Sequence, residues 1–270
     1  MAQVVIENPI LNSPYEEPSS YRLFDDDGIT NDVSAGRRPS SYFVPIAAPK
    51  KKGKQLAFET EWIKERQREN DEINRIRGRV AAWRQGGYSG VTPTTRRLLE
   101  YWRDPGRENK LFFCQIEALE TAIYITEAAS RYGDAWISDY LRQQNADAGS
   151  TLPRIAFKMA TGSGKTVVMA MLIAWHALNK AANGQDARFS DSFLVVAPGI
   201  TIRDRLRVLL PNDPGNYYRE RDLVPADLLS ILQRANIVIT NFHAFALREL
   251  TQASKLTKKL SGQEDSGVST

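Results

Sequence analysis

The sequence has a single cysteine, Cys114, among its 270 residues. An intrachain disulfide needs two cysteines, so none stabilises this fold, and a cytosolic location is the expectation for such a chain. No apolar run approaches the roughly 18 residues that a membrane-spanning helix requires. The first residues also lack the charged and apolar regions of a secretory signal. We therefore expect a cytoplasmic protein without a membrane partner.

The chain also lacks a large net charge, since its 36 basic and 32 acidic residues leave only +4. This total by itself argues weakly for a nucleic-acid partner. The distribution is uneven, because residues 1–36 hold seven acidic residues and one arginine, whereas residues 37–110 hold eighteen basic and nine acidic residues. Most basic clusters are solvated faces, but a basic segment near a nucleotide site would suit an anionic partner.

Composition and periodicity divide the chain into four regions. Residues 1–57 are rich in Pro, Ser, Asp and Tyr without a sustained period, which predicts an extended arm with short elements. Residues 58–150 are expected to be helical. Residues 151–250 are expected to form part of a P-loop domain, and residues 251–270 a polar tail.

Apolar periodicity places the helices of the second region. A single stripe predicts a helix from about residue 58 to residue 84; it consists of Ile73, Ile76, Val80 and Trp83. Thr92 followed by Pro93 is a typical helix start, because threonine caps the first turn and proline is favoured at the first helical position. Further helices are expected over residues 113–131 and 134–144.

The third region alternates short apolar segments with helical ones. Strands are predicted at "RIAFKM" (154–159), "SFLVVAP" (192–198) and "NIVIT" (236–240). Helices are predicted over residues 165–182, 201–210 and 225–235. This alternation is typical of a parallel sheet with helices on both faces, so the predicted class is α/β.

The segment "MATGSGKT" (159–166) has the composition of a phosphate-binding loop between a strand and a helix. Gly162 and Gly164 allow the backbone to curl and approach phosphates closely. Backbone N–H groups at a helix N-terminus bind such anions. The residues predicted to bind the nucleotide through this loop are Thr161, Gly162, Ser163, Gly164, Lys165 and Thr166. Lys165 would contact the β- and γ-phosphates and the Thr166 hydroxyl would coordinate Mg²⁺, which are the catalytic roles in this loop.

The loop departs from the general pattern at one position. That pattern has glycine five residues before Gly164, where this chain has Met159. The later positions build the phosphate cradle, so the departure leaves the chemistry intact. The alternative is a glycine-rich turn that happens to precede a lysine, and the expected strand before it and helix after it argue against that reading.

"MATGSGKT" resembles motif I of superfamily 2 helicases and translocases of the DEAD/DEAH type, and most closely the motor (Res) subunit of type III restriction enzymes. Other stretches agree in order and spacing: "FFCQIEALETAIYITE" (112–127), "FLVVAPGITIRDRL" (193–206), "NIVITNFHAF" (236–245) and the arm segment "RRPSSYFVPIAAPKKKGKQ" (37–55). The resemblance implies a RecA-like domain that binds ATP and Mg²⁺ and acts on DNA. Some Res-type proteins work with a methyltransferase subunit, which would be a further partner.

The resemblance also assigns roles to individual residues. Gln115 matches a glutamine that contacts adenine, and an amide is suited to this because it donates and accepts at once. Otherwise it would be an ordinary polar surface residue. Thr201, Arg203 and Thr240 match positions near the nucleic-acid backbone, and their alternative roles are helix capping and surface solvation. His243 has no second ligand spaced nearby, so we expect no metal at that residue.

Two parts of the family pattern are not found in these residues. No Asp-Glu-x-His segment comes after Phe245, and "QED" (263–265) lies in a polar tail rather than after an apolar strand. Motifs of a second motor lobe are also lacking. We therefore expect ATP binding with negligible hydrolysis by these 270 residues. The alternatives are a non-hydrolysing nucleotide- or DNA-binding module and a small-molecule kinase, for which no acceptor-binding lid is found.

Overall fold

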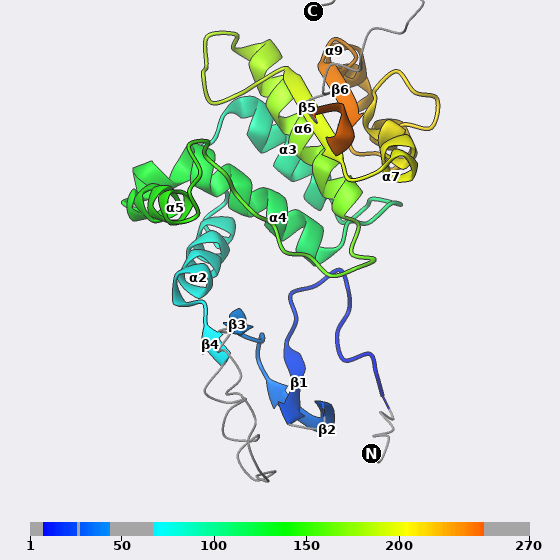
Figure 1. Ribbon diagram of the computed structural model, residues 1–270. Helices are drawn as coiled ribbons and strands as arrows, with labels where there is room; N and C mark the ends of the chain where they lie inside the picture. Colours follow the sequence, from blue (N-terminus) through cyan, green and yellow to red (C-terminus); the bar gives the residue numbers. More distant parts are fainter. Residues whose placement is uncertain (1–7, 26–27, 44–66, 246–270) are drawn as a thin grey trace, which may run out of the picture.

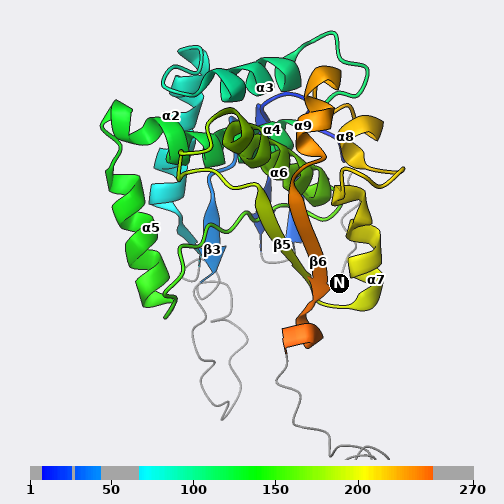
Figure 2. The ribbon, with the colours of Figure 1, turned by 90° about the horizontal axis from the view of Figure 1, so that it is seen from above.

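The computed structural model describes residues 8–25, 28–43 and 67–245. Helices form the centre of the molecule (Figure 1). The long helix α6 (Lys165–Ala182) lies between two groups of elements (Figure 2). On one side are helices α3 (Pro93–Arg103) and α4 (Phe113–Ile123), and on the other are strands β5 (Ser192–Ala197) and β6 (Asn236–Asn241). The N-terminal hairpin of β1 (Ser20–Asp25) and β2 (Gly28–Ala35) lies on the far side of α4 from β5–β6 (Figure 1).

The N-terminal arm forms short antiparallel pairs. Strands β1 (Ser20–Asp25) and β2 (Gly28–Ala35) form a hairpin. Strand β3 (Ser41–Phe43) pairs with β4 (Gln67–Glu69). Short elements without a sustained period are what the composition of this segment predicts. Part of the arm resemblance, residues 44–55, lies outside the described residues.

The prediction of one continuous helix over residues 58–84 is wrong, because strand structure interrupts it at residues 67–69. Helix α2 spans Asp71–Gln85, and the preceding residues form β4. The reason is tertiary: Asn70 N donates to Ser40 O at 2.8 Å, and Ser40 N donates to Asn74 Oδ1 at 2.7 Å. These bonds hold the chain beside β3 in extended form. Residues 58–66 lie outside the described residues.

The predicted apolar stripes form the core of the helical layer. In α2, Ile76, Val80 and Trp83 are buried, as their spacing predicts. Helix α3 (Pro93–Arg103) begins at the predicted cap, where Thr92 accepts from Thr95 N. The remaining elements of this layer are α4 (Phe113–Ile123), a π-helical turn (Tyr124–Ala128), a 3₁₀ turn (Ala129–Tyr132) and α5 (Trp136–Asp147).

Strands β5 (Ser192–Ala197) and β6 (Asn236–Asn241) form a parallel pair in register from Ser192↔Asn236 to Ala197↔Asn241. Short helical elements connect them and come after β6. They are α7 (Ile200–Arg205), α8 (Tyr217–Glu220), α9 (Leu229–Leu232) and the 3₁₀ turns Leu206–Leu209, Ala226–Leu228 and Phe242–Phe245. Both strands stand where the sequence predicts them.

The strand predicted at residues 154–159 is wrong, because this segment has no strand structure. A strand needs a neighbour to complete its ladder of backbone hydrogen bonds. In the described part of the chain, β5 and β6 pair only with each other, and Arg154 instead exchanges hydrogen bonds with Asn145. The fold is thus mixed α/β with small sheets rather than the expected larger parallel sheet.

The β5–β6 pair is also covered on one face only. Val195 is buried toward the core, whereas Leu194, Val196 and Val238 are 58%, 47% and 50% exposed. Helices on both faces, which the alternation of elements predicts, are therefore not seen within residues 8–25, 28–43 and 67–245. Among these same residues, no helix is both long and apolar enough to span a membrane.

A buried polar cluster fastens α6 to the helical layer. Glu127, only 3% exposed, accepts hydrogen bonds from Thr92 N (2.8 Å), Thr95 Oγ1 (2.6 Å) and Trp175 Nε1 (2.9 Å). Asn179 Nδ2 donates to Thr95 Oγ1 at 2.9 Å. Buried polar groups need such partners, so this cluster fixes how α6 lies against α3.

Candidate nucleotide-binding site

The predicted phosphate loop leads directly into the N-terminus of α6. Gly164 is the residue that caps this helix, and both Gly162 and Gly164 have φ of +81°. Residues with a Cβ adopt this left-handed conformation only at a cost, so glycine suits both positions. The first N–H groups of an 18-residue helix have no intrahelical acceptors and therefore offer donors to an anion.

One carbonyl inside the loop holds its shape. Ala160 O accepts from Ser163 N at 3.3 Å, from Ser163 Oγ at 2.7 Å and from Lys165 Nζ at 2.7 Å. Lys165 is nevertheless exposed. Its ammonium thus stays on the loop while remaining accessible from solvent, where a phosphate oxygen can compete for it.

Gln115 connects α4 to the phosphate loop. Its Oε1 accepts from Phe112 N at 3.0 Å, and its Nε2 donates to Ser163 O at 3.0 Å. The side chain is almost fully buried and packs so closely on Gly164 that a Cβ there would lie 2.1 Å from Nε2. Gln115 is therefore not an ordinary surface residue. Each end of its amide retains one further hydrogen-bonding position, which leaves it able to contact a base.

A cavity of about 460 Å³ opens between α4, the phosphate loop and α8. It is lined by four of the residues that the sequence predicts for the nucleotide: Gln115, Gly162, Gly164 and Thr166. The predicted residues Thr161, Ser163 and Lys165 are in the same loop but do not line it. The sequence did not indicate several other lining residues, among them Tyr15, Phe112, Tyr217 and Arg221. Only the upstream segment "FFCQIEALETAIYITE" gives a hint, because it begins at Phe112.

The cavity suits a nucleotide in size and chemistry. Its volume is within the range of about 300–1,000 Å³ usual for small-molecule sites. At Gly162 a Cβ would meet nothing within 4 Å, so the loop is open on that side. The aromatic side chains and the Gln115 amide on one side of the cavity suit a nucleobase. The glycine backbone of the loop on the other side suits the phosphate groups. In the described residues no group of three His, Cys, Asp or Glu could hold a metal. A magnesium ion would thus rely on Thr166 and on the phosphates themselves.

Cys114 lies beside the same loop. Its Sγ is 4.0 Å from Ser163 O, and burial raises the pKa of the thiol above its ordinary value. A thiol of raised pKa is a weak nucleophile at neutral pH. We therefore assign Cys114 no catalytic role.

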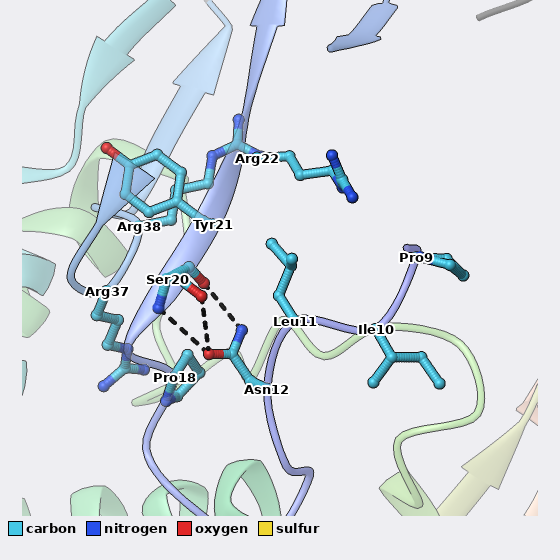
Figure 3. Close-up of a pocket in the computed structure, with 10 residues that line it drawn as sticks. All are labelled: Pro9, Ile10, Leu11, Asn12, Pro18, Ser20, Tyr21, Arg22, Arg37 and Arg38. Atoms are coloured by element: carbon cyan, nitrogen blue, oxygen red, sulfur yellow. Dashed lines mark hydrogen bonds between the residues drawn. The ribbon is translucent and has the colours of Figure 1, made fainter. Parts of the chain in front are cut away.

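A second hollow, of about 550 Å³, lies on the N-terminal arm (Figure 3). Its three arginines already have partners. Arg22 donates to the backbone at Asn31 O (3.0 Å), Arg37 pairs with Glu117, and Arg38 lies over the ring of Phe24 at 4.6 Å. With its positive charges engaged, this hollow is a weaker candidate for an anionic ligand than the cavity at the phosphate loop.

The predicted DNA-contacting residues gather at one edge of the strand pair. Thr201 and Arg203 lie on α7, which comes after the end of β5 and contacts β6. Thr240 pairs with Val196 one residue before the ends of the two strands. Because parallel strands end at the same edge, the chain brings the three residues to one side of the sheet. Thr201 is exposed, and Arg203 Nη2 pairs with Asp204 at 2.9 Å.

Comparison with protein families supports the resemblance seen in the sequence. The family model of the type III restriction enzyme res subunit matches residues 108–265, which is more than half of the chain. No curated protein and no solved structure matches the chain. The matched domain is the N-terminal domain of DEAD/DEAH-type superfamily 2 helicases. The chain therefore belongs to the res subunit family of type III restriction enzymes.

Proposed function

We propose that this chain is the ATP-binding part of a DNA-translocating motor of the restriction-enzyme type. The observation that carries the proposal is the cavity bounded by Gln115 on α4 and by Gly162 and Gly164 at the N-terminus of α6. Membership of the res subunit family supports a helicase-like ATP-binding motor.

In this proposal each end of the cavity binds one part of Mg·ATP. The backbone N–H groups from Thr161 to Thr166 hold the phosphates, and both Ser163 N and Lys165 Nζ exchange their bonds to Ala160 O for phosphate oxygens. The Thr166 hydroxyl is a ligand of Mg²⁺, and the Gln115 amide contacts adenine with its remaining donor and acceptor. The bound ion would neutralise phosphate charge.

We further propose that residues 1–270 bind ATP but hydrolyse it negligibly. Phosphoryl transfer depends on positioning the attacking water and on stabilising the developing charge. The sequence has no Asp-Glu-x-His segment after Phe245. Phosphate release by this chain should therefore stay at background with and without double-stranded DNA, and strong DNA-stimulated turnover would contradict the proposal.

Nucleotide binding itself is tested with Lys165→Ala. Mg·ATP should raise the Tm of the wild-type protein, because a ligand that binds only the folded state stabilises it. The same nucleotide should leave the Tm of Lys165→Ala unchanged. Lys180→Ala is the matched control, since Lys180 lies at the other end of α6 and donates to Asp186 O at 3.3 Å. Equal protection of Lys165→Ala and wild type would overturn the phosphate-loop assignment.

DNA is the proposed second ligand, bound at the edge formed by Thr201, Arg203 and Thr240. Their gathering on one side of β5 and β6 supports this. Alanine replacement of Arg203 should weaken DNA binding and lower its salt dependence, because a phosphate contact releases counterions.

A non-hydrolysing nucleotide- or DNA-binding module is the second candidate, because the cavity at the phosphate loop can hold a nucleotide without turnover. The coding sequence downstream of residue 270 distinguishes the two proposals. An apolar strand with Asp-Glu-x-His at that place supports the motor. ATP-dependent DNA retention without turnover by a chain extended to its natural end supports the module.

A further inference from the structure

The N-terminal arm reaches the candidate nucleotide site through one tight loop. Asn12 closes this loop on itself, because its Oδ1 accepts from Ser19 N at 3.0 Å. The same Oδ1 accepts from Ser20 N at 3.2 Å, and Asn12 Nδ2 donates to Ser20 O at 2.8 Å (Figure 3). The residues between Asn12 and Ser20 therefore project from the arm as a fixed turn. Tyr15 lies within this turn.

The turn is bound to the start of helix α4. Phe113 N, in the first turn of α4, donates to Pro14 O at 2.8 Å. The first N–H groups of a helix have no partner within it, so the arm satisfies a donor that would otherwise need water. The Tyr15 ring packs on Phe112, with centroids 5.6 Å apart. Phe112 is only three residues before Gln115, so these contacts bring Tyr15 to the Gln115 end of α4.

An ion pair holds the arm to the same helix. The Arg37 guanidinium forms two hydrogen bonds to Glu117, each of 2.5 Å, and its centre lies 5.4 Å from the centroid of Phe113. The hydrogen bond to Glu117 raises the pKa of Arg37 above its ordinary value, although burial opposes this. Bidentate arginine–carboxylate pairs fix orientation as well as distance. The arm is thus docked on α4 at two separate points.

The contact with Phe112 covers only part of the Tyr15 side chain. Its side chain remains about half exposed, at 49% of its accessible surface, and it lines the cavity together with Gln115, Gly164 and Thr166. A structural role alone would leave it packed on Phe112. Instead, an aromatic face stands on the Gln115 side of the cavity, beside Phe112.

We propose that Tyr15 is a nucleobase-contacting residue, so that the arm is a component of the nucleotide site and base affinity depends on its docking to α4. This inference rests on the proposed nucleotide function of the cavity. An aromatic ring stacks on any base, because every base has a π-face. Tyr15 therefore increases the affinity for the base, while Gln115 makes the site selective for adenine.

The test compares two ligands by calorimetry: Mg·ATP, and magnesium with inorganic tripolyphosphate, which has the phosphates but no base. Tyr15→Ala should weaken ATP binding about tenfold, which is within the usual effect of losing one stacking partner. It should leave tripolyphosphate binding unchanged. Tyr15→Phe should bind ATP like wild type, because the ring is retained. Tyr21→Ala, elsewhere on the arm, is the matched control and should bind both ligands normally.

Failure of this inference is distinguishable from failure of the proposed function. If Lys165→Ala loses both ligands and Tyr15→Ala binds ATP as wild type does, the phosphate site stands and the inference is overturned. If wild type binds neither ligand, the proposed function itself fails.

Arg37→Ala provides a second variant that leaves Tyr15 in place. Loss of the Arg37–Glu117 ion pair should release the arm from α4. Binding of ATP should then weaken, whereas binding of tripolyphosphate should stay unchanged. The double variant Tyr15→Ala/Arg37→Ala should bind ATP no more weakly than Tyr15→Ala alone, because both changes remove the same contact. Fully additive losses would show that Arg37 acts by another route and would overturn the docking part of the proposal.

Discussion

The two ends of α6 differ in almost every physical respect. At the C-terminal half, Trp175 and Asn179 are 1% and 2% exposed, and both join the polar cluster around Glu127. At the N-terminal end, Lys165 is exposed and the preceding glycines have positive φ. One end is fixed by buried hydrogen bonds, and the other lies at an open cavity.

This difference separates two tasks within one helix. A phosphate-binding loop needs backbone N–H groups without a partner in the protein. Such groups occur at the N-terminus of a helix and not in its packed C-terminal half. Helix α6 is anchored through its C-terminal half to α3 and to the π-helical turn, and its first turn packs through Val167 and Val168, so the N–H groups at its start can stay open to a ligand. Changes at the two ends should therefore act on different properties, namely stability at one and ligand affinity at the other.

The largest effect on stability is expected from Glu127→Ala. The change removes the acceptor shared by Thr92 N, Thr95 Oγ1 and Trp175 Nε1. Trp175 Nε1 keeps Thr95 Oγ1 as an acceptor at 3.0 Å, whereas Thr92 N and Thr95 Oγ1 lose theirs, and an unsatisfied buried donor is costly. We expect the free energy of unfolding in urea to fall by about 3 kcal/mol. Glu127→Gln, which retains one oxygen, should fall by less. A loss no greater than that of a surface substitution would show that the cluster does not anchor α6.

Gly164→Ala should have an intermediate effect, because it lies at the junction of the anchored helix and the open loop. The left-handed φ of +81° costs an alanine about 1–2 kcal/mol. The new Cβ would also meet Gln115 Nε2. We expect lower stability and weaker Mg·ATP binding, measured by urea unfolding and calorimetry. Adding Gln115→Ala should restore only that part of the free energy of unfolding which the clash with Nε2 removes. Full restoration would show that the left-handed backbone conformation does not contribute to the loss.

The smallest effect concerns the pH dependence contributed by His176, midway along α6. Burial lowers the pKa of His176 below its ordinary value, and its Nδ1 is buried without a partner among the described residues. The unfolded chain therefore binds this proton more readily, so the folded state loses stability as pH falls below about 6.5 toward the lowered pKa. His176→Phe should lose less stability than wild type between about pH 7.5 and 5.5, a range that brackets the ordinary histidine pKa. Identical slopes would show that His176 is not the group that titrates.

Local patterns in the sequence predicted the elements whose shape depends on near neighbours. The stripe through Ile76 and Val80 marked α2, and Thr92 with Pro93 marked the start of α3, because both signals act within one or two helical turns. "MATGSGKT" marked the loop and the first residue of α6 for the same reason. These features needed no knowledge of distant residues.

Long-range contacts decided the remainder. "RIAFKM" has the composition of a strand, but a strand forms only where a neighbour offers its backbone, and none does so in the described residues. Residues 67–69 pair with β3 rather than continuing the helical pattern. No periodicity in the arm indicates that Tyr15 meets Phe112, which is far along the chain.

By itself the sequence determined the family, the position of the phosphate loop and the helices that carry it, because glycines, caps and apolar periods act on the adjacent backbone. Only the tertiary structure decided which residues share the cavity, how Gln115 packs on Gly164, and that the arm borders the site. The physical reason is that packing and hydrogen bonding between distant segments depend on the fold of the whole chain. Contacts of this kind produce no local periodicity in the residues that make them.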